Sequence, residues 1–162
     1  MFRIILIISA LSLNLISGEL FLDQFHLLQK RFSAHYEHPI ELQETIVFGV
    51  NIFTDDIDNV DYKFSLYDFT YRRYINRYDS GPFYSFGFRY GAVKMSSDGK
   101  NENENLYMPF YDIGMKTKFN SRWYHSIRLE VGWVMLYSTL INVDDILGLQ
   151  FTPFFSFGYN LD

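Results

Sequence analysis

The stretch 123–137, WYHSIRLEVGWVMLY, alternates between two kinds of side chain at every second position. Successive side chains of a β-strand point to opposite faces, so the two sets define the two faces of one strand. One face is polar and narrow, with Arg128, Glu130 and Gly132 at its middle. The other is almost entirely apolar and has aromatic residues at both ends: Trp123, His125, Ile127, Leu129, Val131, Trp133, Met135 and Tyr137. This pattern is typical of a membrane-spanning β-strand, and a half-buried strand of a soluble protein is the alternative.

Residues 1–18 have the organisation of a secretory signal peptide. Arg3 is a minimal positive segment, residues 4–16 form an apolar core, and Ser17 and Gly18 are small. The core is shorter than the roughly 20 apolar residues that a transmembrane helix needs. We therefore expect cleavage near Gly18 and a barrel domain at 19–162.

The composition of 19–162 excludes several other classes of protein. This part contains no long apolar run, which excludes a helical membrane protein. Aromatic residues make up 20% of the whole chain, which excludes a disordered tail. The absence of cysteine argues against a small disulfide-bonded domain. The net charge of −5 and the dispersed Lys and Arg residues argue against a nucleic-acid partner.

Seven further segments can be read as strands beside 123–137. The first of them, 20–28, alternates poorly, and a short amphipathic helix is an alternative there. Eight short strands with short connections predict an up-and-down meander, and in a membrane such a meander must close because lipid cannot satisfy its edges. An eight-stranded lumen is only wide enough for side chains. We therefore predict an all-β fold, an eight-stranded antiparallel up-and-down transmembrane β-barrel with a filled polar interior. The seven segments are 20–28, 31–38, 45–53, 61–75, 82–95, 106–119 and 151–161.

The expected connections differ in length at the two ends of the barrel. One set is longer and acidic, at 54–60, 96–105 and 138–146. Bacterial outer-membrane barrels have short periplasmic turns and longer external loops, which predicts that the acidic set is external. The other set consists of short turns at 39–44, 76–81 and 120–122.

Several short motifs follow one another along this frame. They are Tyr36-Glu37, the aromatic and basic run 71–75, the GPFY stretch 81–84, DIGMK at 112–116 and the terminal 153–161. With these motifs in this order, the chain resembles the small OmpA-like or OmpX-like outer-membrane β-barrels of Gram-negative and spirochaete genomes. The resemblance covers nearly the whole mature chain, which departs from the family in ending on Leu161-Asp162 instead of an aromatic residue. It implies a monomer in the cell outer membrane, in contact with membrane lipid and lipopolysaccharide or an equivalent.

The predicted inner and outer faces supply the candidate site residues. Charges inside a narrow lumen need partners, so we expect a paired network, and an ion path is the alternative. A lipid-facing girdle is expected at Trp123, Trp133, Tyr137 and Tyr159. The lumen network is expected to comprise Glu37, Asp68, Arg72, Arg89, Asp112, Lys116, Arg128 and Glu130.

The sequence predicts no enzyme, no cofactor and no metal site. A lipid-cleaving hydrolase would need a serine and a histidine that meet, but the neighbours His125 and Ser126 point to opposite faces of one strand. The remaining histidines offer no better pairing. An acidic run could attract Ca²⁺, yet it lacks the glycine and the distal glutamate of a calcium loop. That run comprises Asp55, Asp56, Asp58 and Asp61.

Two functions from different classes remain open. One is a structural or surface-interaction barrel whose acidic external loops contact a host or envelope protein. The other is a small-solute channel. A secreted lipocalin-like carrier also has eight strands, but it needs an apolar interior and a polar exterior, the reverse of the polarity inferred above.

Overall fold

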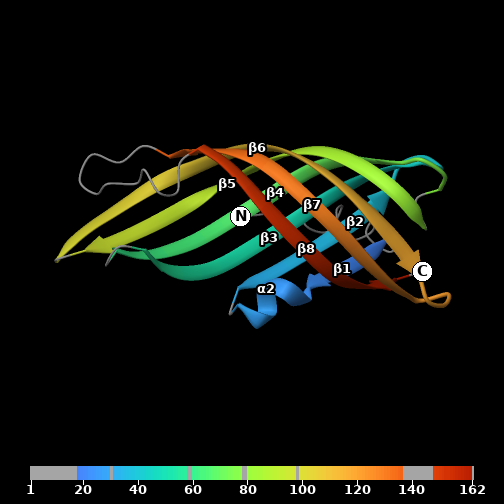
Figure 1. Cartoon of the computed structure of the whole chain (residues 1–162), viewed down its shortest axis with the longest axis horizontal. Helices are drawn as coiled ribbons and strands as arrows, with labels where there is room; N and C mark the ends of the chain where they lie inside the picture. The colour runs from blue at the N-terminus through green and yellow to red at the C-terminus, as the bar shows by residue number, and fades with distance from the viewer. Residues whose placement is uncertain are drawn as a thin grey trace, which may run out of the picture.

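In the computed structural model, which describes residues 18–29, 31–57, 60–77, 80–97, 99–136 and 148–161, the chain forms one closed barrel. Each strand pairs antiparallel with the next one in the sequence, and the last pairs with the first (Figure 1). This arrangement confirms the predicted all-β, eight-stranded antiparallel up-and-down barrel. The described part contains no helix long and apolar enough to cross a membrane. The strands are β1 (Glu19–Asp23), β2 (Phe32–Pro39), β3 (Glu44–Ile57), β4 (Val60–Tyr74), β5 (Gly81–Ser97), β6 (Lys100–Lys118), β7 (Trp123–Leu136) and β8 (Gly148–Asn160).

The pairing register fixes the tilt and the width of the barrel. A path that starts at Glu19 and crosses from each residue to its partner on the next strand arrives at Gln150 on β8. Glu19 itself pairs with Asn160, ten residues further along the same strand. Closure with such a stagger requires the strands to tilt by about 40°. At eight strands, the lumen is then just wide enough for side chains to fill it.

The ambiguous segment 20–28 contains both of the structures that its sequence suggested. Its first part belongs to β1, and its second part forms the short helix α2 (Gln24–Leu28). Asp23 ends the strand and caps the helix, because its Oδ1 accepts a hydrogen bond of 2.8 Å from the backbone N–H of His26. Poor alternation in this segment thus reflects a change of secondary structure after Asp23.

Two of the three connections predicted as long acidic loops are strands, and this prediction was wrong. Residues 54–57 end β3 and residues 100–105 begin β6, so β3 and β4 pair as far as Ile57 and Val60, and β5 and β6 as far as Ser97 and Lys100. These polar residues remain in the sheet because apolar side chains of the neighbouring strands, such as Val93 and Met95, continue to pack inside the barrel. The third stretch, 138–146, lies outside the described residues.

Partway up the barrel, the polar side chains change from the inner to the outer face of the wall, and the apolar side chains change from the outer to the inner face. The change is clearest on β4. In the half nearer the termini, Asp68 and Arg72 point inward, and Phe69 points outward between them. Beyond Leu66, the inward residues become apolar and the outward residues become polar. The inward side chains there are Tyr62, Phe64 and Leu66, and the outward ones are Asp61, Lys63 and Ser65. The lumen therefore has a polar lower half and an apolar upper half, where "lower" is the end that carries the termini.

Glycines make room for large side chains in the lumen. A Cβ at Gly87 would lie 2.5 Å from the ring of Phe110, and one at Gly158 would lie 2.3 Å from the ring of Phe21. These separations are too short for real carbon contacts, so the rings occupy the space that any larger residue would need. The small residues predicted on the inner face are thus the counterparts of inward aromatic rings.

Candidate functional site

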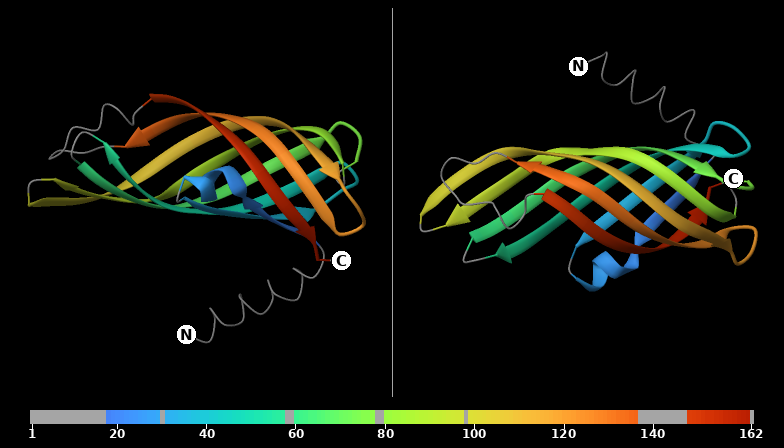
Figure 2. Two further views of the ribbon diagram at one scale, coloured as in Figure 1. Left: turned by 60° about the horizontal axis from the view of Figure 1, so that its bottom comes forward. Right: turned by 45° about the horizontal axis from the view of Figure 1, so that its top comes forward.

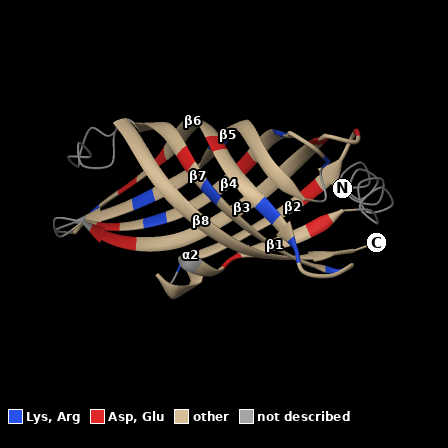
Figure 3. Cartoon of the chain, turned by 45° about the vertical axis from the view of Figure 1, so that its right-hand side comes forward, with Lys and Arg blue, Asp and Glu red and all other residues tan. Residues whose placement is uncertain are grey.

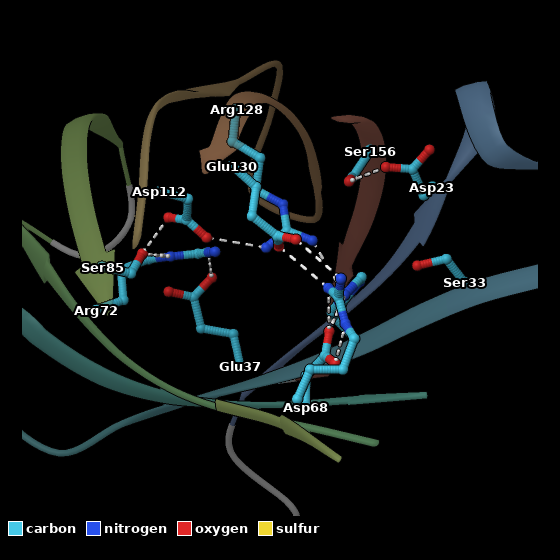
Figure 4. A network of polar contacts seen from close by, with 12 residues as sticks. Asp23, Ser33, Glu37, Asp68, Arg72, Ser85, Asp112, Arg128, Glu130 and Ser156 are labelled. Carbon is cyan, nitrogen blue, oxygen red and sulfur yellow. Dashed lines mark hydrogen bonds and ion pairs between the residues drawn. The ribbon is translucent and has the colours of Figure 1, made fainter. Parts of the chain in front are cut away.

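All eight charged residues expected in the lumen are inside the barrel. None of them is more than 8% exposed. In Figure 3, positively and negatively charged positions of the strands lie close to one another in the body of the barrel. Figure 4 shows the side chains themselves, which converge from opposite walls of the lumen.

Arg89 is the centre of the upper end of this network. Its guanidinium group donates to both oxygens of Asp68, at 2.6 and 2.9 Å, and to both oxygens of Glu130, at 2.8 and 3.1 Å. Phe110 lies beside it, with its ring centre 5.2 Å from the guanidinium carbon. A planar guanidinium group holding two carboxylates in paired hydrogen bonds is a strong and directional arrangement. It also links three strands, because Asp68 lies on β4, Arg89 on β5 and Glu130 on β7.

A second centre is formed by Arg128 and Asp112. Arg128 Nη1 lies 3.0 Å from Asp112 Oδ2, and its Nη2 lies 3.1 Å from the Nε2 atom of His35. The guanidinium carbon stacks 3.9 Å from the ring centre of Phe154. Asp112 also accepts a hydrogen bond from the hydroxyl group of Ser85. Although Arg128 and Glu130 are neighbours on one face of β7, each has its closest ion partner on another strand.

The third centre closes the lower end of the lumen around Glu37. This carboxylate contacts Arg72 at 3.1 Å and accepts hydrogen bonds from Tyr74 at 2.6 Å and Thr45 at 2.7 Å. Lys116 Nζ lies 3.6 Å from Glu37 and forms a closer ion pair with Glu19. Each charge in this centre is therefore compensated within the lumen, as buried charges require.

Sequence reasoning missed several members of the network. Glu19 was hidden because it precedes the segment with poor alternation. His35 and Ser85 are buried on the inner faces of β2 and β5, but nothing in their spacing showed that they would contact charged residues. Among the described residues of the lumen network, four cations contact five carboxylates: Arg72, Arg89, Lys116 and Arg128 against Glu19, Glu37, Asp68, Asp112 and Glu130.

The aromatic residues expected in a girdle lie on the outer wall where they are described. Trp123 packs against Tyr159 with ring centres 4.7 Å apart, and both are near the end of the barrel that carries the termini. Trp133 is at the other end of β7 and is 56% exposed. Tyr137 lies outside the described residues. Aromatic side chains thus occupy both ends of the outer face of β7.

The geometry offers no catalytic pair on β7, where His125 stacks outside against Phe119 and Ser126 is buried inside. The acidic run is divided between the two faces of the sheet: Asp55 pairs with Arg31 at 2.5 Å, while Asp56 lies opposite Asp61 on the adjacent strand, on the outer face. Asp58 lies outside the described residues. Within the part that the structure describes, no group of three or more His, Asp or Glu side chains could hold a metal ion.

A comparison with solved structures finds a similar barrel. The chain superposes on the N-terminal β-barrel domain of Pseudomonas aeruginosa OprF, determined by crystallography, with a TM-score of 0.63. The alignment covers 89% of this chain and 95% of that domain, at 11% sequence identity. This likeness shows a shared fold. No family model matches the sequence, and no curated protein matches it. The predicted resemblance to small outer-membrane barrels is therefore confirmed for the fold alone, which this chain shares with the OprF barrel.

Proposed function

We propose that this protein is an integral outer-membrane β-barrel with a structural or surface-interaction role and a closed lumen. The observation that carries the proposal is the outer face of the lower barrel. That face presents Phe69, Phe86, Ile113, Ile127 and Leu129 to the surroundings, each at least 43% exposed. A soluble barrel would bury such a surface, whereas lipid favours it.

The dimensions of this outer face support the proposal. Trp123 and Trp133 are ten residues apart on β7. At about 3.3 Å per residue and a tilt of about 40°, they are separated by about 25 Å along the barrel axis. The apolar band of outer-membrane barrels is about 25 Å tall and has aromatic residues at both rims. Above Trp133, the outer face becomes polar, as at Lys63 and Lys94, which suits a surface in water.

The lumen supports a structural role over a channel. Arg89 and its two carboxylates occupy the lumen beside β4–β7, and the Glu37 centre occupies the end nearer the termini. Every cation and every carboxylate of these centres contacts an oppositely charged side chain, so an entering ion would have to break buried pairs. We propose that contact with a host or envelope protein occurs through the upper parts of β3–β6, which extend beyond the band. We also propose that the protein acts as a monomer, surrounded by lipid and lipopolysaccharide or an equivalent.

The first test is the location and heat-dependent mobility of the protein. We expect it to fractionate with the outer membrane and to migrate differently on a denaturing gel before and after boiling, because closed barrels resist detergent unfolding. The measurement is cell fractionation followed by paired boiled and unboiled samples. Recovery in the soluble periplasmic or culture fraction would refute the membrane location.

The second test concerns the lumen. Refolded protein in a planar lipid bilayer should give no steady conductance, because the buried ion pairs fill the barrel. Bilayers treated with the refolding detergent alone serve as the control. Stable, ion-selective current steps that scale with the amount of protein would favour the channel function instead.

A further inference from the structure

The barrel wall has a window on the side formed by β1 and β2. β1 pairs with β8 only as far up as Asp23 and Ser156, and β2 pairs with β3 only as far up as Phe32 and Ile52. In the described part of the chain, the upper segments of β8 (148–155) and β3 (53–57) thus face each other with no strand between them. Figure 2 (left) shows α2 lying in this region, below the upper ends of β8 and β3. Three strand spacings separate the two edges, or about 14 Å.

The described side chains around the window lie along its lower side and its β3 side. On the lower side, the ring of His26 from α2 packs 4.6 Å from the ring of Phe154. On the β3 side, Arg31 lies over the ring of Phe53, 4.8 Å from its centre, and pairs with Asp55. Pro153 belongs to the free edge of β8, and proline is suited to an edge because it lacks a backbone N–H donor.

Behind the window is a cavity of about 230 Å³ in the apolar upper half of the lumen. Its polar boundary consists of Arg31 and Asp55 at the rim, Gln150 and Thr152 on β8, and Arg89 at the floor. The nitrogens of Arg89 already donate to Asp68, Glu130 and the sulfur of Met108. We call this cavity the upper chamber; its apolar lining is Phe53, Phe64, Leu66, Leu106, Met108 and Val134.

The size and lining of the upper chamber favour a hydrocarbon. An apolar cavity of about 150 Å³ stays dry and binds benzene, so proportional scaling gives the chamber room for about nine carbon atoms. A polar ligand would gain little binding free energy, because Arg89 at the floor already forms ion pairs with two carboxylates. A linear chain would fill the space and bury the surrounding apolar surface.

The outer surface beside the window indicates the source of such a chain. Leu28, Ile52 and Phe151 flank the window on the outside, and all three are at least half exposed. Leu149, on the free edge of β8, pairs with Trp133 at the upper rim of the proposed lipid-facing band. The window therefore opens at the level of the outer half of that band, where lipid tails are the neighbouring molecules.

We propose that the upper chamber binds one acyl chain of an outer-leaflet lipid, which enters sideways through the window between β3 and β8. This inference rests on the proposed membrane location. A structural role of the barrel does not require a ligand in the chamber, so the bound acyl chain goes beyond that role. It also gives a reason for the truncation of β1 and β2, since full-length strands there would seal the chamber from the bilayer.

The test uses a phospholipid with a photoreactive diazirine near the end of one acyl chain. The full protein is refolded into vesicles that contain this lipid, irradiated and digested, and the modified residues are mapped by tandem mass spectrometry. Neighbouring residues provide the internal control, because Leu106 and Val134 line the chamber while Tyr107 and Met135 face outward. We expect modification on both faces in the upper barrel, with chamber residues labelled as strongly as outward ones.

A blocking variant tests the route. Gln150→Trp places a bulky side chain at the window and should reduce labelling of Leu106 and Val134 at least tenfold. Phe151→Trp, one residue along the same strand and facing outward, should leave the chamber signal unchanged. The boiled and unboiled gel mobility of each variant shows whether its barrel has closed. If Gln150→Trp does not fold, the labelling pattern of the parent protein still decides the proposal.

The outcomes separate the two proposals. Labelling of outward residues alone would overturn the chamber proposal and leave the membrane location intact. A protein that stays soluble and unlabelled would refute both. In a parallel arm with a diazirine fatty acid, chamber labelling by the fatty acid but not by the phospholipid would overturn the assignment to a membrane lipid.

Discussion

Replacing Arg89 with methionine is expected to lower the free energy of unfolding of the refolded barrel by about 3–5 kcal/mol. Methionine keeps much of the length of the side chain but removes the charge that Asp68 and Glu130 share. Both carboxylates are almost completely buried, so each would be left without its cationic partner in a poorly hydrated lumen. The measurement is urea denaturation in lipid vesicles, followed by the fluorescence of Trp123 and Trp133.

Arg31→Met is the matched control for this experiment. Arg31 also pairs with an aspartate, but its side chain is 29% exposed and that of Asp55 is 35% exposed. Pairs in contact with water contribute about 0–1 kcal/mol. We therefore expect a small change at Arg31 and a large one at Arg89. Equal losses at the two positions would show that burial does not set the strength of the Arg89 cluster.

A double-mutant cycle identifies the partner of Glu130. Glu130→Gln alone should destabilise the barrel, but much less so in the Arg89→Met background, because the two side chains interact directly. The cycle with Arg128 should give weaker coupling, since Arg128 pairs with Asp112. Additive effects of Glu130→Gln and Arg89→Met would contradict the pairing.

The pairing of these charges could not be predicted from the sequence, although their faces could. The face on which a residue lies follows from alternation along its own strand, which places Arg128 and Glu130 on the same face of β7. This is a local property of the chain. The partner of each charge depends on the stagger of the closed barrel and on reach across the lumen. Arg89 on β5 meets Glu130 on β7 with β6 between them in the sheet. No spacing in the sequence encodes such a contact.

The upper half of the barrel differs from the sequence-based expectation for a related reason. The sequence predicted a polar interior for the barrel as a whole. In the structure the side-chain period is unbroken, but the chemical character of the two faces is exchanged near Leu66. The same exchange made 100–105 look like a loop, because outward polar residues of a strand in water resemble a polar connection. The apolar interior and polar exterior that a lipocalin-like carrier needs are thus present in the upper half alone.

Leu129→Arg is expected to destabilise the membrane-inserted barrel by about 2–4 kcal/mol and to reduce its assembly in cells. Leu129 faces outward opposite Ile113, between the two tryptophans of β7, so the new charge would lie near the middle of the proposed apolar band. The measurement is urea denaturation in vesicles together with the amount of folded protein in the outer membrane.

The control places the same charge above the band. Asn105 is exposed on the outer wall of β6, beyond Tyr107 and close to the polar residues of the upper barrel. Asn105→Arg should cost no more than about 1 kcal/mol, because arginine at an interface remains hydrated. Ser126 is unsuitable as an inward control, since it is buried beside Arg72 and Arg128 around a void of only about 10 Å³. Equal tolerance of arginine at 129 and 105 would mean that lipid does not cover the lower barrel, whereas a loss confined to Leu129 would locate the bilayer between the two rims of β7.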